Sequence, residues 1–334
     1  MKSRTTLLLG AGASRAVSYA SMRSIPSPLD SDFFELLQRV EPSAEPLISL
    51  SELIQWVLAN NYPIWHSMEL IFYTLHTRAR MTEVLFPDER FEMTVERLHD
   101  LFSQAIDVLL REAHGKEFCE FHVDLLRHMK RSDAIVTVNY DLVVERALKE
   151  LARTASFGNW LYGFETRPKD ASELPTLHKL HGSVNWIYEK GRSRFTARQT
   201  SWTDFDEKPG YRGHRSLATS TFPIMLPYWE KKVEDEPWKG IWNQAASHLR
   251  KTARLIVWGY SLPRTDLKTQ ELVRLSMSRS GSLLRDVCVI DPSAEVRTRW
   301  RGIFADKKFW QYTSIAEFRE DPPNWWPGFP RSKG

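Results

Sequence analysis

The sequence is poor in cysteine, with only Cys119 and Cys288, far apart among 334 residues. Two thiols cannot supply the four ligands of a structural zinc site, nor the disulfide framework of a small secreted protein. Long apolar runs are missing too, because none reaches the roughly 18 residues that a membrane-spanning helix requires. We therefore expect a cytoplasmic protein with reduced thiols, no structural zinc and no membrane segment.

An excess of charge of one sign is also absent, since 46 Lys and Arg face 42 Asp and Glu and give a net charge of +4. This mild balance favours anionic ligands without indicating nucleic acid. The basic and aromatic segment 191–202 (GRSRFTARQTSW) could contact nucleic acid, but a solvated loop is the simpler expectation. Direct nucleic-acid binding is therefore not predicted.

The chain begins with a short apolar run, Thr5–Leu9, followed by the small residues GAGAS at 10–14. Lys2 and Arg4 precede the run, as in a targeting segment. The segment Thr5–Ala13 is short, it is broken by glycine and Arg15 follows closely, which is unlike a signal peptide. We expect a buried strand that enters a glycine turn, and then a polar, proline-bearing loop at 24–31 (SIPSPLDS).

Two kinds of pattern follow along the chain. Between residues 31 and 130, apolar residues recur three and four apart, which is typical of amphipathic helices. After residue 130, runs typical of strands alternate with patterns typical of helices. The strand-like runs are 133–141, 176–189, 253–259, 286–291 and 308–312, and the helical patterns are 142–153, 240–252, 266–277 and 294–304. Residues 221–227 are expected to be a short strand or an extended segment. Continuous apolar strands alternating with helices indicate a parallel sheet covered on both faces. We predict an α/β, Rossmann-like, doubly wound domain formed by 1–30 and 131–334, with a mostly helical insertion subdomain at 31–130.

Ligands bind such sheets at the carboxyl ends of the strands, near the switch point in strand order. Small or polar residues follow five predicted strands: Gly10, Ala11, Gly12, Ala13 and Ser14; Asn139 and Asp141; His181; Gly259 and Ser261; and Asp291. Glycines let the backbone approach a pyrophosphate, and a following helix directs its N–H groups at the charge.

Each position also has a structural explanation. The glycines could form a tight turn without a ligand, Asp141 could be a helix cap, and His181 could be a structural histidine. The dinucleotide motif also lacks its third glycine, because Arg15 occupies that position. All five strand ends together favour a dinucleotide site over chance.

These motifs resemble the sirtuin superfamily, specifically the zinc-free sirtuin-like domains of prokaryotic antiphage defence. The resemblance runs in order through GAGAS (10–14), TVNYD (137–141), LHGS (180–183), GYSLP (259–263) and Asp291. The zinc-binding cysteines of protein-deacylating sirtuins are missing. If SDFF (31–34) corresponds to the family's proline-aspartate-phenylalanine-arginine, Phe34 replaces the arginine.

The resemblance implies cleavage of the bond between nicotinamide and ribose, with NAD as the substrate. Asn139 would orient water or the ribose, His181 would accept a proton, and Asp141 would hold the carboxamide. Residues 10–14, Gly259, Ser261 and Asp291 would bind NAD. We expect an NAD glycohydrolase that releases nicotinamide and ADP-ribose and depletes NAD in abortive antiphage defence.

Two alternatives stay open, an NAD-dependent protein deacylase and a non-catalytic module that senses NAD or ADP-ribose. A dehydrogenase is disfavoured, because no clear ribose-binding acidic residue follows the glycines by about 20 positions. The chain shows no ATPase motif of its own. Since defence-type relatives act with such components, we expect a homo-oligomer and a separate sensor or ATPase partner, for instance a HerA-type ATPase.

Overall fold

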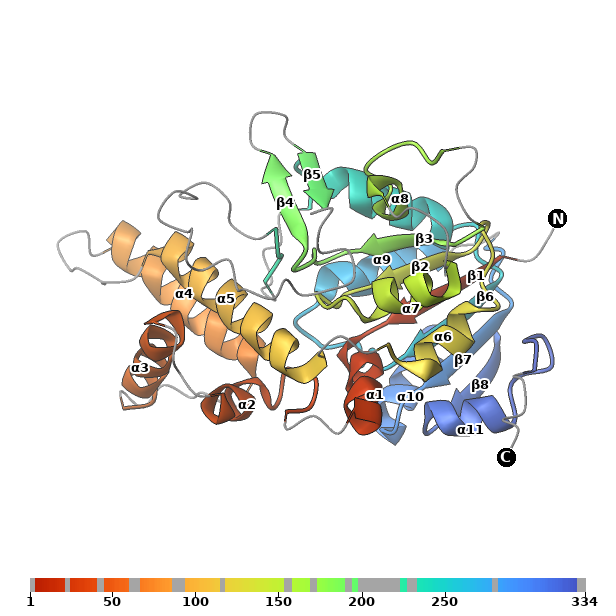
Figure 1. Ribbon diagram of the computed structural model, residues 1–334, viewed down its shortest axis with the longest axis horizontal. Coiled ribbons are helices and arrows are strands. Elements are labelled where there is room, and N and C mark those ends of the chain that lie inside the picture. Colours follow the sequence, from red (N-terminus) through yellow and green to blue (C-terminus); the bar gives the residue numbers. More distant parts are fainter. Residues whose placement is uncertain are drawn as a thin grey trace.

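A six-stranded parallel sheet lies at the centre of the protein in the computed structural model (Figure 1). Its strands are β1 (Thr5–Leu9), β2 (Ala134–Thr137), β3 (Thr176–Lys179), β6 (Arg254–Trp258), β7 (Asp286–Ile290) and β8 (Lys308–Tyr312). They lie in the order β3-β2-β1-β6-β7-β8. The chain runs outward from β1 to β3 and returns to the other side of β1 with β6. The switch point therefore lies at the carboxyl ends of β1 and β6.

The structure describes residues 4–21, 25–40, 45–59, 67–85, 94–114, 118–152, 158–168, 173–189, 194–197, 223–226, 233–277 and 282–328. None of the helices within these ranges is long and apolar enough to cross a membrane.

The central strands are mostly apolar because helices cover both faces of the sheet, whereas the edge strand β8 is partly exposed. Strands β1, β2 and β7 are buried along their whole length. The covering helices are α1 (Ala11–Ser21), α6 (Glu120–Leu126), α7 (Val143–Ala152), α8 (Trp238–Leu249), α9 (Leu267–Met277), α10 (Ala294–Ile303) and α11 (Ile315–Glu320). Helix α6 packs on α7, whereas α8 packs on α9, and α7 lies in front of the sheet and α9 behind it in Figure 1. The predicted doubly wound parallel fold is confirmed.

The helical insertion extends to one side of the sheet, at the left of Figure 1. It contains α2 (Phe33–Arg39), α3 (Glu45–Ala59), α4 (Met68–Leu85) and α5 (Val95–His114). Helix α5 contacts the other three and also α1, so it joins the insertion to the α/β part. A second hydrophobic cluster holds these helices together, with Phe72 and Phe102 edge to face at 5.0 Å. The helical character of the described residues between 31 and 130 is as predicted, and the exact domain boundaries stay a prediction.

Two features differ from the expectations. Helix α1 begins at Ala11, directly after the glycine turn, so a helix precedes the expected loop. Residues 194–197 of the segment expected to be a solvated loop form β5, antiparallel to β4 (Trp186–Glu189), and the rest of 191–202 lies outside the described residues. Phe195 is buried and stacks on Trp186 at 5.5 Å, which explains this strand. Within 221–227, which is expected to be extended, the described residues 223–226 include one antiparallel bridge, from Ile224 to Gly182.

Candidate active site at the carboxyl edge of the sheet

The loops after β1 and β6 touch through their backbones. The Gly12 N–H donates to the Gly259 carbonyl at 3.0 Å. A Cβ on Gly10 would lie 2.5 Å from the same carbonyl oxygen, and a Cβ on Gly259 would lie 2.1 Å from the Ala13 nitrogen. Gly259 also has a φ of +63°, which disfavours any side chain. Packing between the two loops therefore requires these glycines before any ligand is considered.

The N-terminus of α1 lies at the carboxyl end of the central strand β1, where its partial positive charge favours an anion. Part of its donor set is already used, because the Ala13 N–H donates to the Gly10 carbonyl at 2.9 Å and the Gly12 N–H to Gly259. Ala11 and Gly12 are half-buried, whereas Ala13 and Ser14 are buried. Ala11 and Gly12 are therefore the accessible part of this turn.

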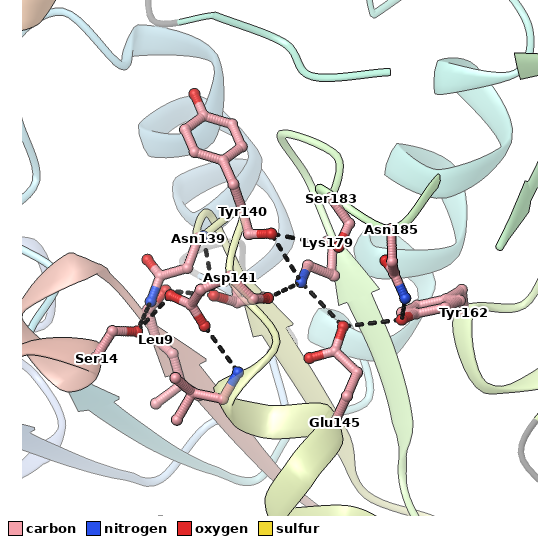
Figure 2. Close-up of polar contacts among 12 residues, drawn as sticks. Leu9, Ser14, Asn139, Tyr140, Asp141, Glu145, Tyr162, Lys179, Ser183 and Asn185 are labelled. Carbon is pink, nitrogen blue, oxygen red and sulfur yellow. Dashed lines mark hydrogen bonds and ion pairs between the residues drawn. The ribbon is translucent and has the colours of Figure 1, made fainter. Parts of the chain in front are cut away.

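Asn139, Ser14 and Asp141 form a chain of hydrogen bonds between the loops after β1 and β2 (Figure 2). The Asn139 Nδ2 donates to the Gly10 carbonyl and to Ser14 Oγ, both at 2.9 Å. The Ser14 hydroxyl in turn donates to Asp141 Oδ2 at 2.6 Å. Asp141 Oδ1 accepts the Val143 N–H at 3.0 Å at the start of α7. Asp141 therefore both caps helix α7 and holds the glycine loop through Ser14. The side-chain amide of Asn139 uses its Nδ2 in these contacts, so its Oδ1 is the atom that can accept a further hydrogen bond.

Lys179, the last residue of β3, lies next to this chain of hydrogen bonds and is 1% exposed. Its Nζ donates to the Asp141 carbonyl and to Glu145 Oε1, the latter at 2.9 Å (Figure 2). Glu145 on α7 also accepts the Tyr162 hydroxyl at 2.9 Å. Asn185 Nδ2 donates to that hydroxyl at 3.0 Å. A buried ion pair thereby ties the backbone of the Asn139–Asp141 loop to the neighbouring strand.

These contacts set the charge state of Asp141. Burial raises the pKa of its carboxyl, but His114, Lys179 and the hydrogen bonds it accepts lower the pKa more, so the net pKa is below the ordinary value. Burial lowers the pKa of His114 to about 4. At neutral pH the cation that acts on Asp141 is therefore Lys179, and Asp141 is ionised.

His181 follows β3 and is 5% exposed. Its Nε2 lies 3.4 Å from Asp266 Oδ2 and 3.4 Å from Thr269 Oγ1. Its carbonyl accepts the Met225 N–H at 2.8 Å. On another side, the Tyr140 ring lies 6.3 Å from the imidazole, between centroids. His181 therefore adjoins the loop that carries Asn139 and Asp141.

The remaining predicted residues lie at the ends of β6 and β7. Ser261 is exposed after Gly259. Asp291 is buried, burial raises the pKa of its carboxyl, and its Oδ1 accepts the Ser293 N–H at 2.9 Å. Gly10, Gly12, Ser14, Asn139, Asp141 and Gly259 are thus in direct contact, whereas Asp291 lies two strands away from β1.

Sequence reasoning missed several residues around this site. Arg15, in the position of the absent glycine, pairs with Asp32 at 2.7 Å and donates to the Ser27 carbonyl at 2.6 Å. It therefore fixes the chain that enters the helical insertion, in which Phe34 is buried. Lys179, Glu145 and Asp266 were missed too, and only Asp266 had a signal, as the acidic residue shortly after GYSLP.

The described residues show no metal centre of the usual kind. No group of three or more His, Cys, Asp or Glu within the described ranges is arranged to hold a metal ion. Cys119 and Cys288 are both buried and free of disulfides.

Comparisons with known proteins relate the chain to one family. The family model described as a SIR2-like domain matches residues 133–315. Among solved structures, a complex of Sir2 with a p53 peptide and NAD+ is similar at 13% identity, with 95% of this chain and 91% of that chain covered and a TM-score of 0.44. A complex of a Sir2 homologue with NAD is similar at 13% identity, with 95% and 86% covered and a TM-score of 0.42. No curated protein matches the chain.

Proposed function

The chain belongs to the SIR2-like family, whose model matches residues 133–315, and we propose that it cleaves the nicotinamide–ribose bond of NAD. One observation carries the proposal. Asn139 and Asp141 are joined through Ser14 to the glycine loop at the switch point, with His181 on the adjoining strand end. That is the place where open α/β sheets bind their ligands.

The proposed chemistry needs little acid catalysis, because the nicotinamide ring nitrogen is already cationic and leaves as a neutral molecule. The transition state resembles an oxocarbenium ion, as in glycoside hydrolysis. The Asn139 Oδ1 can orient a water molecule or a ribose hydroxyl, since its Nδ2 is bonded to Gly10 and Ser14. A neutral His181 can accept the proton of that water or hydroxyl near pH 7.

Asp141 has a different part in this proposal. One carboxylate oxygen accepts from Val143 and the other from Ser14, and the side chain is buried. These contacts favour positioning of Ser14 and Asn139 over direct contact with the nicotinamide carboxamide. Ala11, Gly12, Ser261 and Asp291 are proposed to contact the phosphates and riboses.

We propose water as the acceptor, which gives nicotinamide and ADP-ribose. The chain has two cysteines, too few for the zinc module of protein-deacylating sirtuins. Metal analysis that finds about one zinc per chain would remove this argument and favour the deacylase. A module that only senses NAD or ADP-ribose has no need of both Asn139 and His181, which supports turnover.

The test is to incubate the purified protein with NAD, without acylated peptide, and to quantify nicotinamide. Asn139→Ala and His181→Ala should each lower the rate by about 10²–10⁴-fold, the usual contribution of such groups. His128→Ala, at the opposite edge of the sheet, is the matched control and should cleave at the parent rate. A folded His181→Ala protein with parent activity would exclude the catalytic role of this histidine.

We further propose that the enzyme is an NAD-depleting effector of antiphage defence, held inactive until a partner or assembly releases it. A homo-oligomer acting with a separate sensor, such as a HerA-type ATPase, is the proposed arrangement. Cells that express the wild type should lose NAD on phage infection, and cells with His181→Ala should not. Unchanged NAD in infected wild-type cells, with the ATPase present, would contradict this role.

A further inference from the structure

Asp266 is a buried carboxylate directly against His181, although the two residues are distant in the sequence. Asp266 precedes α9 and is 1% exposed, and its Oδ2 lies 3.4 Å from His181 Nε2. The same Oδ2 accepts the Tyr260 hydroxyl at 2.8 Å. Tyr260 follows Gly259 in the GYSLP motif, so the loop after β6 holds the carboxylate that faces the histidine after β3.

We propose that Asp266 is a positioning residue for His181, keeping the imidazole proton on Nε2 so that Nδ1 is the basic nitrogen of the ring. The inference rests on the proposed function, in which His181 accepts a proton. A carboxylate accepts hydrogen bonds and does not donate them, so an imidazole nitrogen beside it is held as N–H. The other ring nitrogen then carries the lone pair that proton transfer needs.

The surroundings of the imidazole support this assignment. Thr269 on α9 lies 3.4 Å from Nε2, and as a neutral hydroxyl it can accept or donate. On the side of the β2–α7 loop the neighbour is the Tyr140 ring, whose hydroxyl donates to the Met225 carbonyl. Glu69 and Asp30 of the insertion act electrostatically on Tyr140. Asp266 is a charged group in direct contact with His181, and its negative charge stabilises the imidazolium that forms when the proton is accepted.

The fixed position of Asp266 follows from the turn that carries it. The Asp266 N–H donates to the Pro263 carbonyl, and the Asp266 carbonyl accepts from the Gln270 N–H at the start of α9. These backbone bonds place the side chain without using its carboxylate. A variant that changes only the carboxylate therefore keeps the turn and isolates the effect on His181.

The first experiment uses the full-length protein without NAD and records histidine NMR spectra as the pH is changed. The His181 signals are identified by their loss in His181→Asn. The wild type should show the Nε2–H tautomer, and Asp266→Asn should lower the titration midpoint of His181 by about one pH unit, because an adjacent carboxylate is lost. Asp286→Asn, a carboxylate at the amino end of β7, is the matched control and should leave the midpoint unchanged.

The second experiment measures nicotinamide release from NAD across pH. Asp266→Asn should lower kcat at least about tenfold while KM changes little, because orientation of a base matters mainly in the transition state. The acid limb of its pH–rate profile should move to lower pH, in step with the NMR midpoint. A general structural defect would leave that limb in place.

A wild-type protein in the Nδ1–H form would overturn the inference, and this result needs no variant to fold. An unchanged midpoint in Asp266→Asn would overturn it equally. A shifted midpoint in a protein that releases no nicotinamide would support the coupling of Asp266 to His181 and refute the proposed function instead.

Discussion

The buried pair of Lys179 and Glu145 allows a sharp test of how the candidate site is held. Both side chains are 1% exposed and their charged atoms lie 2.9 Å apart. Lys179→Met removes the cation and leaves the Glu145 carboxylate buried with Tyr162 as its hydrogen-bond donor. Breaking a buried pair in this way costs about 3–5 kcal/mol of unfolding free energy. We expect the upper part of that range, because the Asp141 carbonyl also loses a donor.

A second variant separates the charge from the packing. Lys179→Met combined with Glu145→Gln removes both charges, and the glutamine Oε1 can still accept the Tyr162 hydroxyl. The double variant should therefore regain most of the loss and end about 1–2 kcal/mol below the wild type, the cost of the Asp141 hydrogen bond. The coupling energy of the pair is the stability loss of the double variant minus the summed losses of the two single variants, Lys179→Met and Glu145→Gln.

The assay is urea unfolding at pH 7, followed by tryptophan fluorescence, for the wild type, both single variants and the double variant. A loss of less than about 1 kcal/mol in Lys179→Met would refute the reasoning, since that is the value of an exposed pair. A double variant as unstable as Lys179→Met would also refute it, because the cost would then come from lost packing and not from the stranded carboxylate.

Three further predictions concern the loops and the buried histidines. Gly259→Ala should lower the unfolding free energy by more than about 2 kcal/mol in urea melts, because its φ is +63° and a Cβ meets the Ala13 nitrogen; a neutral result would show that the two loops separate readily. Ser14→Ala should cost about 1–3 kcal/mol, since two hydrogen-bond partners are stranded, and should lower kcat as well; unchanged values would contradict the chain of hydrogen bonds. Burial lowers the pKa of both His114 and His122 to about 4. Below about pH 6.5 the unfolded chain therefore binds more protons than the folded chain. The unfolding free energy is thus fully retained above that pH and decreases as the pH falls toward 4. Each histidine should lower the unfolding free energy by about 1.4 kcal/mol at pH 5.5 relative to neutral pH. His122→Gln should make the dependence of unfolding free energy on pH correspondingly less steep, and an unchanged dependence would show that other groups cause the acid sensitivity.

The sequence predicts the central strands of the sheet well because they are buried on both faces. The runs at 253–259 and 286–291 contain β6 and β7, and the glycine turn starts where β1 ends. Helix α1 was not predicted, because its first turn is Ala-Gly-Ala-Ser and glycine favours a turn over a helix. Strand β5 was missed because four residues are too few to show an alternating hydrophobic pattern. Its Phe195 is buried through contacts with aromatic residues that are distant in the sequence.

The candidate site was predictable as a set of strand ends and not as a set of contacts. Parallel strands bring their carboxyl ends to one edge, so Asn139 and Ser14 could be expected nearby. Lys179 is the last residue of a buried strand that the sequence does not mark as a charged site, and its partner Glu145 lies on a helical face that looks exposed in the sequence. Only the packing of α7 on the sheet brings the two charges together. Asp266 faces His181 for the same reason, through the return of the chain from β3 to β6.

The contacts also decide which substitutions can report on chemistry. Ser14 and Asp141 hold the loops to one another, so we expect the loss of either side chain to lower the proposed activity through the geometry of Asn139, even if neither touches NAD. Ser261 is exposed at the same edge and its hydroxyl belongs to no such chain in the described residues. Ser261→Ala should therefore raise KM for NAD with little change in kcat or in unfolding free energy, as expected for lost uniform binding. A site whose backbone loops touch is tested most cleanly at side chains such as this one, which the fold does not need.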